Sequence, residues 1–278
     1  MKTRFAILTG ILLCLIPCMA RANNFGQTAV MSLCPQGSQE AEEIYQEARK
    51  RWLGQAGYKK NPEKAEELFE KAMFMGNSKA PLGIGGIYMW DYRDKYQEEK
   101  RLEFMIRMYN EGIKMGCAEG HVLLAECYSK GWGVERNYNR ALEELKQGVA
   151  KGSPKAMEFY GTHFIENTSE KEKGRELLRK SMGLKNGDAG VALAMSYLEE
   201  DDDRAYAALR NGAKLGSLNS LGWLSYYYLQ GIHGQKANSK LSECVENIEK
   251  EIDWFYTPEP IENFDELCPH PTPLHVTP

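Results

Sequence analysis

The sequence predicts an all-α fold, a superhelical α-solenoid in which two-helix units stack one after another. The first observation is a set of glycines that suit helix ends and recur with spacings of 40, 36, 35 and 29 residues. Such spacings are typical of helix-turn-helix solenoids. These anchor glycines are Gly76, Gly116, Gly152, Gly187 and Gly216. The second observation is that small and aromatic residues recur at fixed distances from them, which predicts that the units pack alike.

Small residues stand four positions before and nine positions after each anchor glycine. We expect helices to cross closely there, because a missing side chain lets two backbones approach. The two sets are Ala72, Gly112, Gly148, Gly183 and Gly212 before the anchor, and Gly85, Ala125, Gly161, Ser196 and Ser225 after it. Twelve positions after the anchor, aromatic residues are expected to fill the space between units. They are Tyr88, Tyr128, Phe164 and Tyr228, while Glu199 breaks the pattern.

The segment 131–156 shows how one unit begins and ends. Gly131 and Gly133 permit a turn. Asn137 can cap the helix that follows, and Gly152 suits the left-handed residue after the end of that helix. Side-chain caps of the same kind are expected at Ser38, Asn61 and Asp201.

Three runs carry a resemblance to a known family. They are Lys64-Ala65 with Lys71-Ala72, Ala80-Pro81-Leu82-Gly83 with Ile87-Tyr88, and Gly131-Trp132-Gly133-Val134 with Arg140-Ala141. They resemble the Sel1-like repeats, a family related to the TPR repeats, and the resemblance covers roughly residues 40–235. It implies an α-solenoid that binds protein partners.

Residues 1–22 are predicted to form a signal peptide. The basic residues Lys2 and Arg4 precede an apolar run of 14 residues, and a small-residue cleavage site ends at Ala22. The run is short for a membrane span. We therefore expect an exported, periplasmic protein. An uncleaved anchor and a lipoprotein modified at Cys18 are the alternatives.

Three further parts follow: a lead-in over 23–37, an array of about five to six units over 38–235, and a capping helix with an extended tail over 236–278. An array needs end units that cover its open apolar face, and the amphipathic segment 239–255 suits that role. Six of the eleven prolines lie beyond this segment, so the tail is expected to be extended. A helix followed by the tail motif Leu267-Cys268-Pro269 resembles exported bacterial Sel1-like proteins, some of which are immunity proteins against type VI secreted phospholipases.

The charge balance limits the class of partner. Removal of the signal peptide lowers the number of basic residues from 35 to 32 against 39 acidic ones, which gives a net charge of −7. A negative charge without a basic cluster argues against nucleic acid and against anionic membrane surfaces. The acidic run 199–203 fits a solvated turn at a helix start better than a docking patch for a basic partner.

Five cysteines remain after removal of the signal peptide: Cys34, Cys117, Cys127, Cys244 and Cys268. An exported protein is expected to form at least one disulfide. Cys117 and Cys127 would lie about 15 Å apart on one helix, which is beyond disulfide reach. The sequence favours a bridge between Cys244 and Cys268 that ties the tail to the last helix, and it leaves open whether the other three are free. Metal-ligand spacing such as Cys-x-x-Cys is absent.

The sequence predicts no enzyme, no cofactor and no metal. The cluster Gly83-Ile84-Gly85-Gly86 lies in a helical pattern and lacks the strand that precedes a dinucleotide-binding loop. Close helix packing explains it instead. His163 with Tyr160 and Glu166 is the one local group of catalytic type, and the polar faces of helices produce such groups by chance.

A binding face is predicted from positions 3, 10 and 14 after each anchor glycine. These positions lie on one side of the first helix of a unit, because seven and four residues are close to whole turns. They change identity between units and stay largely polar, which predicts a solvent-exposed ridge on the inner surface. A plain solvated face would look similar, but large aromatic residues are favoured at interfaces. We expect a partner-binding surface made of Trp90, Glu126, Lys130, Glu166, Tyr197 and Tyr226.

Two functions fit these observations. The first is a non-catalytic periplasmic scaffold that acts as an immunity protein and neutralises a secreted toxic enzyme, with a phospholipase-type type VI effector as the expected partner. The alternative is a general cell-envelope adaptor that tethers other proteins or surface components. The partner's identity and the oligomeric state are left open.

Overall fold

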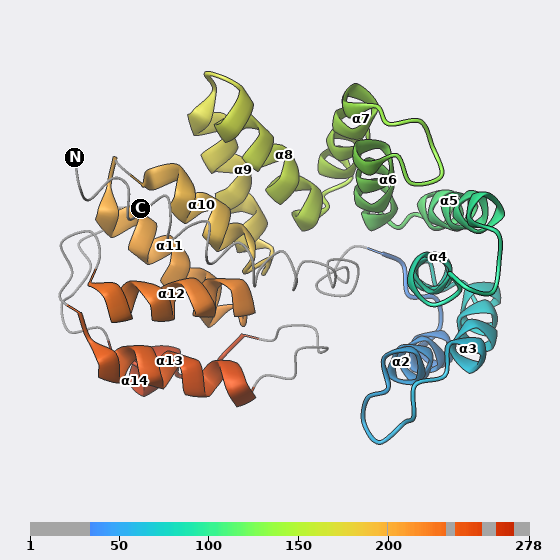
Figure 1. Ribbon diagram of the computed structural model, residues 1–278, viewed down its shortest axis with the longest axis horizontal. Helices are drawn as coiled ribbons and strands as arrows, with labels where there is room; N and C mark the ends of the chain where they lie inside the picture. The colour runs from blue at the N-terminus through green and yellow to red at the C-terminus, as the bar shows by residue number, and fades with distance from the viewer. Residues whose placement is uncertain (1–33, 199, 232–236, 252–259, 270–278) are drawn as a thin grey trace.

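Figure 1 shows the computed structural model, in which helices follow one another along a curved arc. The structure describes residues 34–198, 200–231, 237–251 and 260–269. Within these residues it contains 13 α-helices and no strand, so the predicted all-α solenoid is confirmed. The predicted signal peptide lies outside the described residues.

The arc is built from pairs of neighbouring helices. The bounds are α2 Gln39–Leu53, α3 Pro62–Phe74, α4 Ala80–Trp90, α5 Glu98–Lys114, α6 Glu119–Lys130, α7 Tyr138–Ala150, α8 Pro154–Asn167, α9 Lys171–Gly183, α10 Ala189–Tyr197, α11 Asp202–Lys214, α12 Leu218–Gln230, α13 Ser239–Glu251 and α14 Phe264–Leu267. Each helix packs against the helix that follows it in the sequence, from α2 against α3 to α12 against α13. In the first half of the arc, α4 and α6 lie on the inner side and α5 and α7 on the outer side (Figure 1).

The helix boundaries follow from local side-chain chemistry. Asn61, Asn137 and Asp201 each accept a hydrogen bond from the backbone N–H three residues later, which satisfies one free donor at the helix start. Gly116 and Gly152, which end two outer helices, have φ angles of 93° and 87°. Only glycine adopts this left-handed conformation without steric cost. The caps and stops expected at these positions are therefore present.

The fourth unit departs from the expected pattern. Its left-handed residue is Lys185, with a φ of 67°, and Gly187 has no positive φ. Gly187 instead lies against the next unit, where an added Cβ would come within 2.7 Å of the carbonyl oxygen of Gly212. Counted from Lys185, the flanking spacings become 33 and 31 residues, so the units are more regular than the glycines alone indicate.

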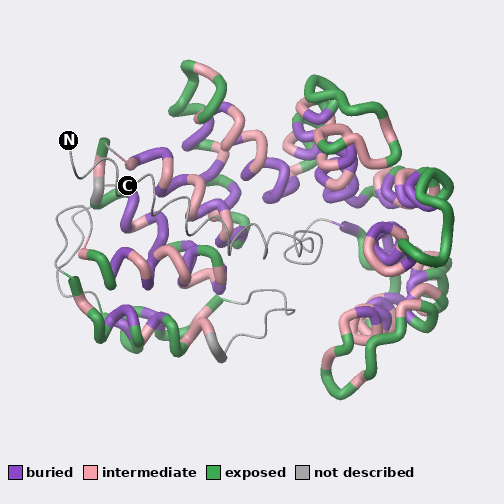
Figure 2. The backbone as a smooth tube through the Cα atoms, in the orientation of Figure 1, coloured by how far each residue is buried: buried purple, intermediate pink, exposed green. Residues whose placement is uncertain are grey.

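Close helix crossings occur at several of the predicted small residues. A Cβ on Gly161 of α8 would lie 2.9 Å from the carbonyl oxygen of Gly174 on α9. A Cβ on Gly148 of α7 would lie 2.7 Å from the Cβ of Ala156. Gly183 is different, since nothing lies within 4 Å of an added Cβ there. Buried residues run along the facing sides of the paired helices (Figure 2), as a continuous solenoid core requires.

The C-terminal end is closed by α13, α14 and a disulfide between Cys244 and Cys268, the pairing favoured by the sequence. Within the tail, residues 264–267 form a short helix where an extended chain was expected. Phe264 anchors this helix because its side chain is only 2% exposed. On the chain-entropy estimate, a loop of this size stabilises the fold by about 3.5 kcal/mol relative to the reduced chain.

The close crossing of α8 and α9 generates a stability prediction. We expect Gly161→Leu to lower the free energy of unfolding by about 1–3 kcal/mol, because its side chain has no room beside the Gly174 carbonyl. Gly183→Ala is the matched control: it adds a side chain at a helical glycine with open space around it. It should be neutral or stabilise by up to about 1 kcal/mol. Urea unfolding measures both, and a Gly161→Leu protein as stable as the wild type would refute the assigned helix crossing.

Candidate partner-binding surface

The first position of the predicted binding face is buried rather than exposed. Lys79, Glu119 and Lys155 each lie three residues after an anchor glycine, and their exposed fractions are 0%, 0% and 5%. They stand at the starts of α4, α6 and α8, where each inner helix meets the preceding unit. The expectation of a solvent-exposed ridge is therefore wrong at this position. A charge held there needs a partner from a neighbouring helix.

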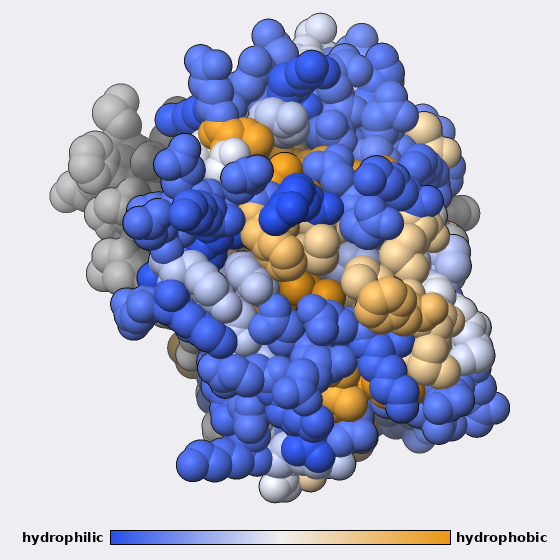
Figure 3. Space-filling view, turned by 90° about the vertical axis from the view of Figure 1, so that its right-hand side faces the viewer, coloured by the Kyte–Doolittle hydropathy of each residue, from blue (hydrophilic) through white to orange (hydrophobic). Residues whose placement is uncertain are grey.

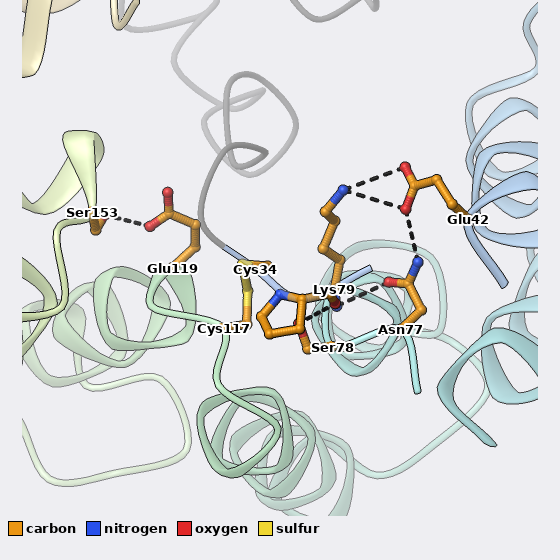
Figure 4. Close-up of a disulfide and its surroundings, with 9 residues drawn as sticks. Cys34, Glu42, Asn77, Ser78, Lys79, Cys117, Glu119 and Ser153 are labelled. Carbon is orange, nitrogen blue, oxygen red and sulfur yellow. Dashed lines mark hydrogen bonds and ion pairs between the residues drawn. A yellow bond between two sulfur atoms is a disulfide. The ribbon is translucent and has the colours of Figure 1, made fainter. Parts of the chain in front are cut away.

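Lys79 finds its partner on α2. Its Nζ lies 3.3 Å from Glu42 Oε1, and Glu42 also accepts a hydrogen bond of 2.9 Å from the Asn77 side-chain amide (Figure 4). Burial lowers the pKa of Lys79, and the nearby Glu42 carboxylate opposes this shift. The ion pair therefore links α2 to the start of α4 on the inner side.

Lys155 belongs to a cluster of side chains that links the inner helices α8, α10 and α12. Its Nζ lies 2.9 Å from Glu158 Oε2 on α8 and 3.2 Å from Asp188 Oδ2 before α10. Asp188 in turn accepts a 2.7 Å hydrogen bond from the Ser217 hydroxyl at the start of α12. Burial alone would raise the pKa of Asp188, but Lys155 and the Ser217 hydrogen bond hold it below its usual range. This cluster is internally paired and connects consecutive units.

Glu119 is left incompletely partnered. Its Oε2 accepts a hydrogen bond from the Ser153 hydroxyl. Its Oε1 has no hydrogen-bond partner among the described residues. Burial raises the pKa of Glu119, and Ser153 and Lys155 only partly offset this effect. Figure 4 shows this carboxyl and the Lys79 ammonium on either side of the Cys34–Cys117 disulfide, pointing to the same side of the inner helices.

Glu126 lies two turns further along α6. Its side chain is half-buried and makes no hydrogen bond or ion pair within the described part of the chain. Burial raises its pKa, while Lys130 and Lys155 pull it down. The inner side of α6 thus carries two carboxyl groups whose pKa values are raised by burial and only partly lowered by nearby lysines.

The predicted aromatic anchors lie in three separate environments. Trp90 is half-buried, with its ring centroid 6.1 Å from that of Trp132 and the Arg93 guanidinium 5.1 Å above it. Tyr226 is half-buried beside Trp223, again at 6.1 Å.

Tyr197 is only 5% exposed. Arg175 and Arg204 stack over its ring at 4.4 and 5.7 Å, and Arg179 donates a 2.7 Å hydrogen bond to its hydroxyl. It therefore packs against α9 and α11 side chains and presents little surface to a partner. Lys130 and Glu166, at the ends of α6 and α8, are exposed as expected. A binding role for the six predicted residues stays a proposal.

The buried charges and one disulfide were not predicted from the sequence. The sequence does contain one sign of the buried charges: Lys79, Glu119 and Lys155 alternate in charge at the same repeat position. A uniformly solvated face does not require such an alternation. Cys34 bonds to Cys117, 83 residues away in sequence. Cys127 is free and buried, and burial raises the pKa of its thiol to about 12. No local pattern relates Cys34 to Cys117, since the arc itself brings them together.

His163, which the sequence places near Tyr160 and Glu166, takes part in an aromatic contact. His163 Nδ1 lies 3.0 Å from the Tyr138 hydroxyl, and its ring stacks on Tyr160. Among the described residues, no three His, Cys, Asp or Glu side chains are placed to hold a metal ion. A search of the same residues finds no helix with the length and hydropathy needed to span a membrane. The face shown in Figure 3, at the right-hand side of Figure 1, is mostly hydrophilic with patches of apolar side chains between the polar ones.

Three segments match the Sel1 repeat family: residues 51–73, 118–153 and 216–243. They cover α3, the α6–α7 pair, and α12 with the start of α13. These three segments are therefore Sel1 repeats, as the motifs indicated. No curated protein is significantly similar to it in sequence.

Solved structures share this fold. A Sel1 repeat protein from Oxalobacter formigenes superposes with a TM-score of 0.59 at 20% identity, over 77% of this chain and 86% of that chain. The immunity protein Pa5087 from Pseudomonas aeruginosa gives 0.58 at 18% identity, over 84% and 80%. The immunity protein PA5088 from Pseudomonas aeruginosa gives 0.61 at 17% identity, over 86% and 90%. At these identities the likeness shows the fold alone.

The buried carboxyl of Glu119 gives a prediction for the pH dependence of stability. Its raised pKa means that the folded protein holds this proton more tightly than the unfolded chain. Its contribution therefore becomes unfavourable as the pH rises above the ordinary range of a glutamate, by about 1.4 kcal/mol for each unit of pKa difference. Glu119→Gln removes this penalty, so its Tm should exceed that of the wild type more at about pH 7 than at about pH 4.

The control for this measurement is Glu103→Gln, which changes an exposed carboxyl on α5. Its effect on Tm should differ little between the two pH values. Calorimetry on both variants decides the question. A Glu119→Gln protein that loses stability relative to the wild type on going to neutral pH would contradict the assignment.

Proposed function

We propose that this chain is a non-catalytic periplasmic scaffold that acts as an immunity protein: it binds and neutralises a secreted toxic enzyme, a phospholipase-type type VI effector. The observation that carries this proposal is the fold shared with two Pseudomonas aeruginosa immunity proteins over 84% and 86% of this chain. The resemblance of the C-terminal helix and tail to exported Sel1-like immunity proteins supports the same reading.

An exported location supports this role. The segment 1–22 has the pattern of a signal peptide. The two disulfides favour an oxidising compartment, because such bonds are rare in the cytosol. A toxin delivered to the cell envelope would meet its inhibitor there.

Affinity capture tests the proposal directly. The full-length chain with a C-terminal tag is produced in its own host, purified from the periplasmic fraction and analysed for proteins that accompany it. We expect a mature N-terminus near Asn23 and one stoichiometric partner. That partner should hydrolyse phospholipid vesicles, and addition of the purified protein should suppress this activity at least tenfold. Several weakly bound partners without lipid hydrolysis would favour the envelope adaptor and overturn the immunity role.

The predicted aromatic anchors supply the mutational test. Trp90→Ala combined with Tyr226→Ala should weaken partner binding at least tenfold, or about 1.4 kcal/mol. Phe74→Ala is the control, because among the described residues Phe74 on α3 is the most exposed large apolar one, at 87%. It should leave the dissociation constant unchanged. Equal binding by the double variant and the control, with helicity intact in both, would exclude these two anchors.

A further inference from the structure

The inner surface carries a row of partly exposed apolar side chains that begins at α6 and runs toward the C-terminal end of the array. They stand seven or ten residues after the left-handed residue that precedes each of these helices, one or two turns beyond the buried charges. All of them are half-buried. We call this row the inner apolar strip; its members are Leu123 on α6, Phe159 on α8, Ala192 and Met195 on α10, and Trp223 and Tyr226 on α12.

Contacts between the starts of these helices place the members of the strip side by side. Ser153, before α8, donates a hydrogen bond to Glu119 of α6. Asp188, before α10, pairs with Lys155 of α8 and accepts a hydrogen bond from Ser217, before α12. Each of the helices α6, α8, α10 and α12 also contacts the next of them directly. The turns that carry the strip are therefore adjacent.

The strip does not continue onto α4. The corresponding residues there are Gly83 and Gly86, seven and ten residues after Gly76. A Cβ added to Gly83 would lie 2.7 Å from the ring of Phe69, and one added to Gly86 would lie 2.5 Å from the ring of Trp52. Side chains of α2 and α3 thus fill both places. The strip therefore ends at α6 and can be followed in one direction only, toward α12.

The chain before α2 is fastened at this end of the strip. Cys34 forms a disulfide with Cys117, which lies two residues before α6 (Figure 4). The next residue is held as well, because the backbone N–H and the hydroxyl of Ser78 donate to the Pro35 carbonyl at 2.9 and 2.7 Å. The residues that precede Cys34 in the sequence are therefore tethered where the strip begins.

Residues 23–33 lie outside the described part of the chain, and their composition suits the strip. They contain no charged residue. Eleven extended residues reach about 36 Å, and three steps of about 8–10 Å between packed helices span about 24–30 Å. Alternate residues of an extended chain share one face. Counted back from the tether, that face would carry Leu33, Met31, Ala29, Gln27 and Phe25.

We propose that residues 23–33 bind the inner apolar strip of their own chain and occupy it until a partner displaces them. Burial of apolar surface favours this contact. The tether at Cys34 makes the contact intramolecular, which raises the effective concentration of the segment to the millimolar range. A partner that uses the same surface binds only the molecules whose strip is free, so its apparent affinity falls in proportion to that fraction.

The docking of the segment does not depend on the proposed function, whereas its effect on a partner does, because it requires that a partner uses the inner surface. Separate measurements therefore address the docked position and the effect on binding.

Site-specific photo-crosslinking tests the docked position. A benzophenone amino acid replaces Met31 or Phe25 in the full-length, disulfide-bonded protein, and the linked peptides are identified by mass spectrometry. Position 31 is three residues from the tether, a reach of about 10 Å, so its links should fall on α6 and α8. Position 25 is nine residues away, a reach of about 30 Å, so its links should fall on α10 and α12.

The control places the same amino acid at Phe74, which is exposed on α3 and should give no link to the strip. Two results would overturn the proposal. One is the absence of links from positions 25 and 31 to these helices. The other is the same distribution of links from both positions, because a segment laid along the strip must reach different helices at its two ends.

An apolar dye tests whether the segment covers the strip. Met31→Ser with Leu33→Ser weakens the apolar face of the segment, so the fluorescence of added bis-ANS should rise at least about threefold as the strip becomes exposed. Val30→Ser is the matched control, because it removes an apolar side chain from the opposite face of the extended segment. It should leave the dye fluorescence unchanged. Equal fluorescence of the double variant and the wild type would contradict the occupied strip.

A captured toxin separates this inference from the proposed function. We expect the toxin to bind the Met31→Ser, Leu33→Ser protein at least about threefold more tightly than the wild type, since a larger fraction of molecules is free to bind. Equal affinities would refute the regulation and leave the immunity role standing. If the crosslinks appear as expected but no toxin is captured, the immunity role fails and the docked segment stands.

Discussion

The fold depends on the close approach of neighbouring helices at points where no side chain intervenes. At the α8–α9 crossing, Gly161 and Gly174 face each other, and a Cβ on either would press on the other's carbonyl oxygen. Gly187 and Gly212 approach in the same way one unit later. Each unit of a solenoid contacts only its neighbours. These crossings therefore fix how each unit sits on the one before, and their repetition sets the curvature of the arc.

Two disulfides hold parts of different units together, one at the α5–α6 connection and one at the C-terminal end of the array. Cys34–Cys117 holds the segment before α2 against the start of α6. The backbone N–H and hydroxyl of Ser78 both donate to the Pro35 carbonyl within the same segment. At the other end, Arg210 donates to Asp265 and to the Cys268 carbonyl beside the second disulfide. The links at the C-terminal end supply contacts to the last unit, which has no further unit beyond it in the described residues.

The repeat, the caps and the tail disulfide could be predicted from the sequence because each depends on a short stretch of chain. A cap such as Asn137 acts three residues away, and Cys244 and Cys268 flank a single connection. The Cys34–Cys117 bond was out of reach because it depends on how intervening units curve. Helical periodicity identified the inner side of α6 but not the depth of each residue, so the burial of Glu119 and of Tyr197 was missed. Depth depends on what the neighbouring unit places opposite.

That dependence also decides which buried charges of the inner helices are paired. A charge at the first turn of an inner helix is buried against the preceding unit, so it needs a partner from a neighbouring helix. Lys79 pairs with Glu42 and Lys155 with Asp188, whereas Glu119 accepts a hydrogen bond from the Ser153 hydroxyl and is only partly compensated by Lys155. Charged residues that pair with each other between neighbouring helices are buried by that packing, so they are not available to bind a partner. In a repeat array, a buried charge that no neighbouring helix fully compensates makes one unit differ from the others, and among the described residues the carboxyl of Glu119 is such a charge.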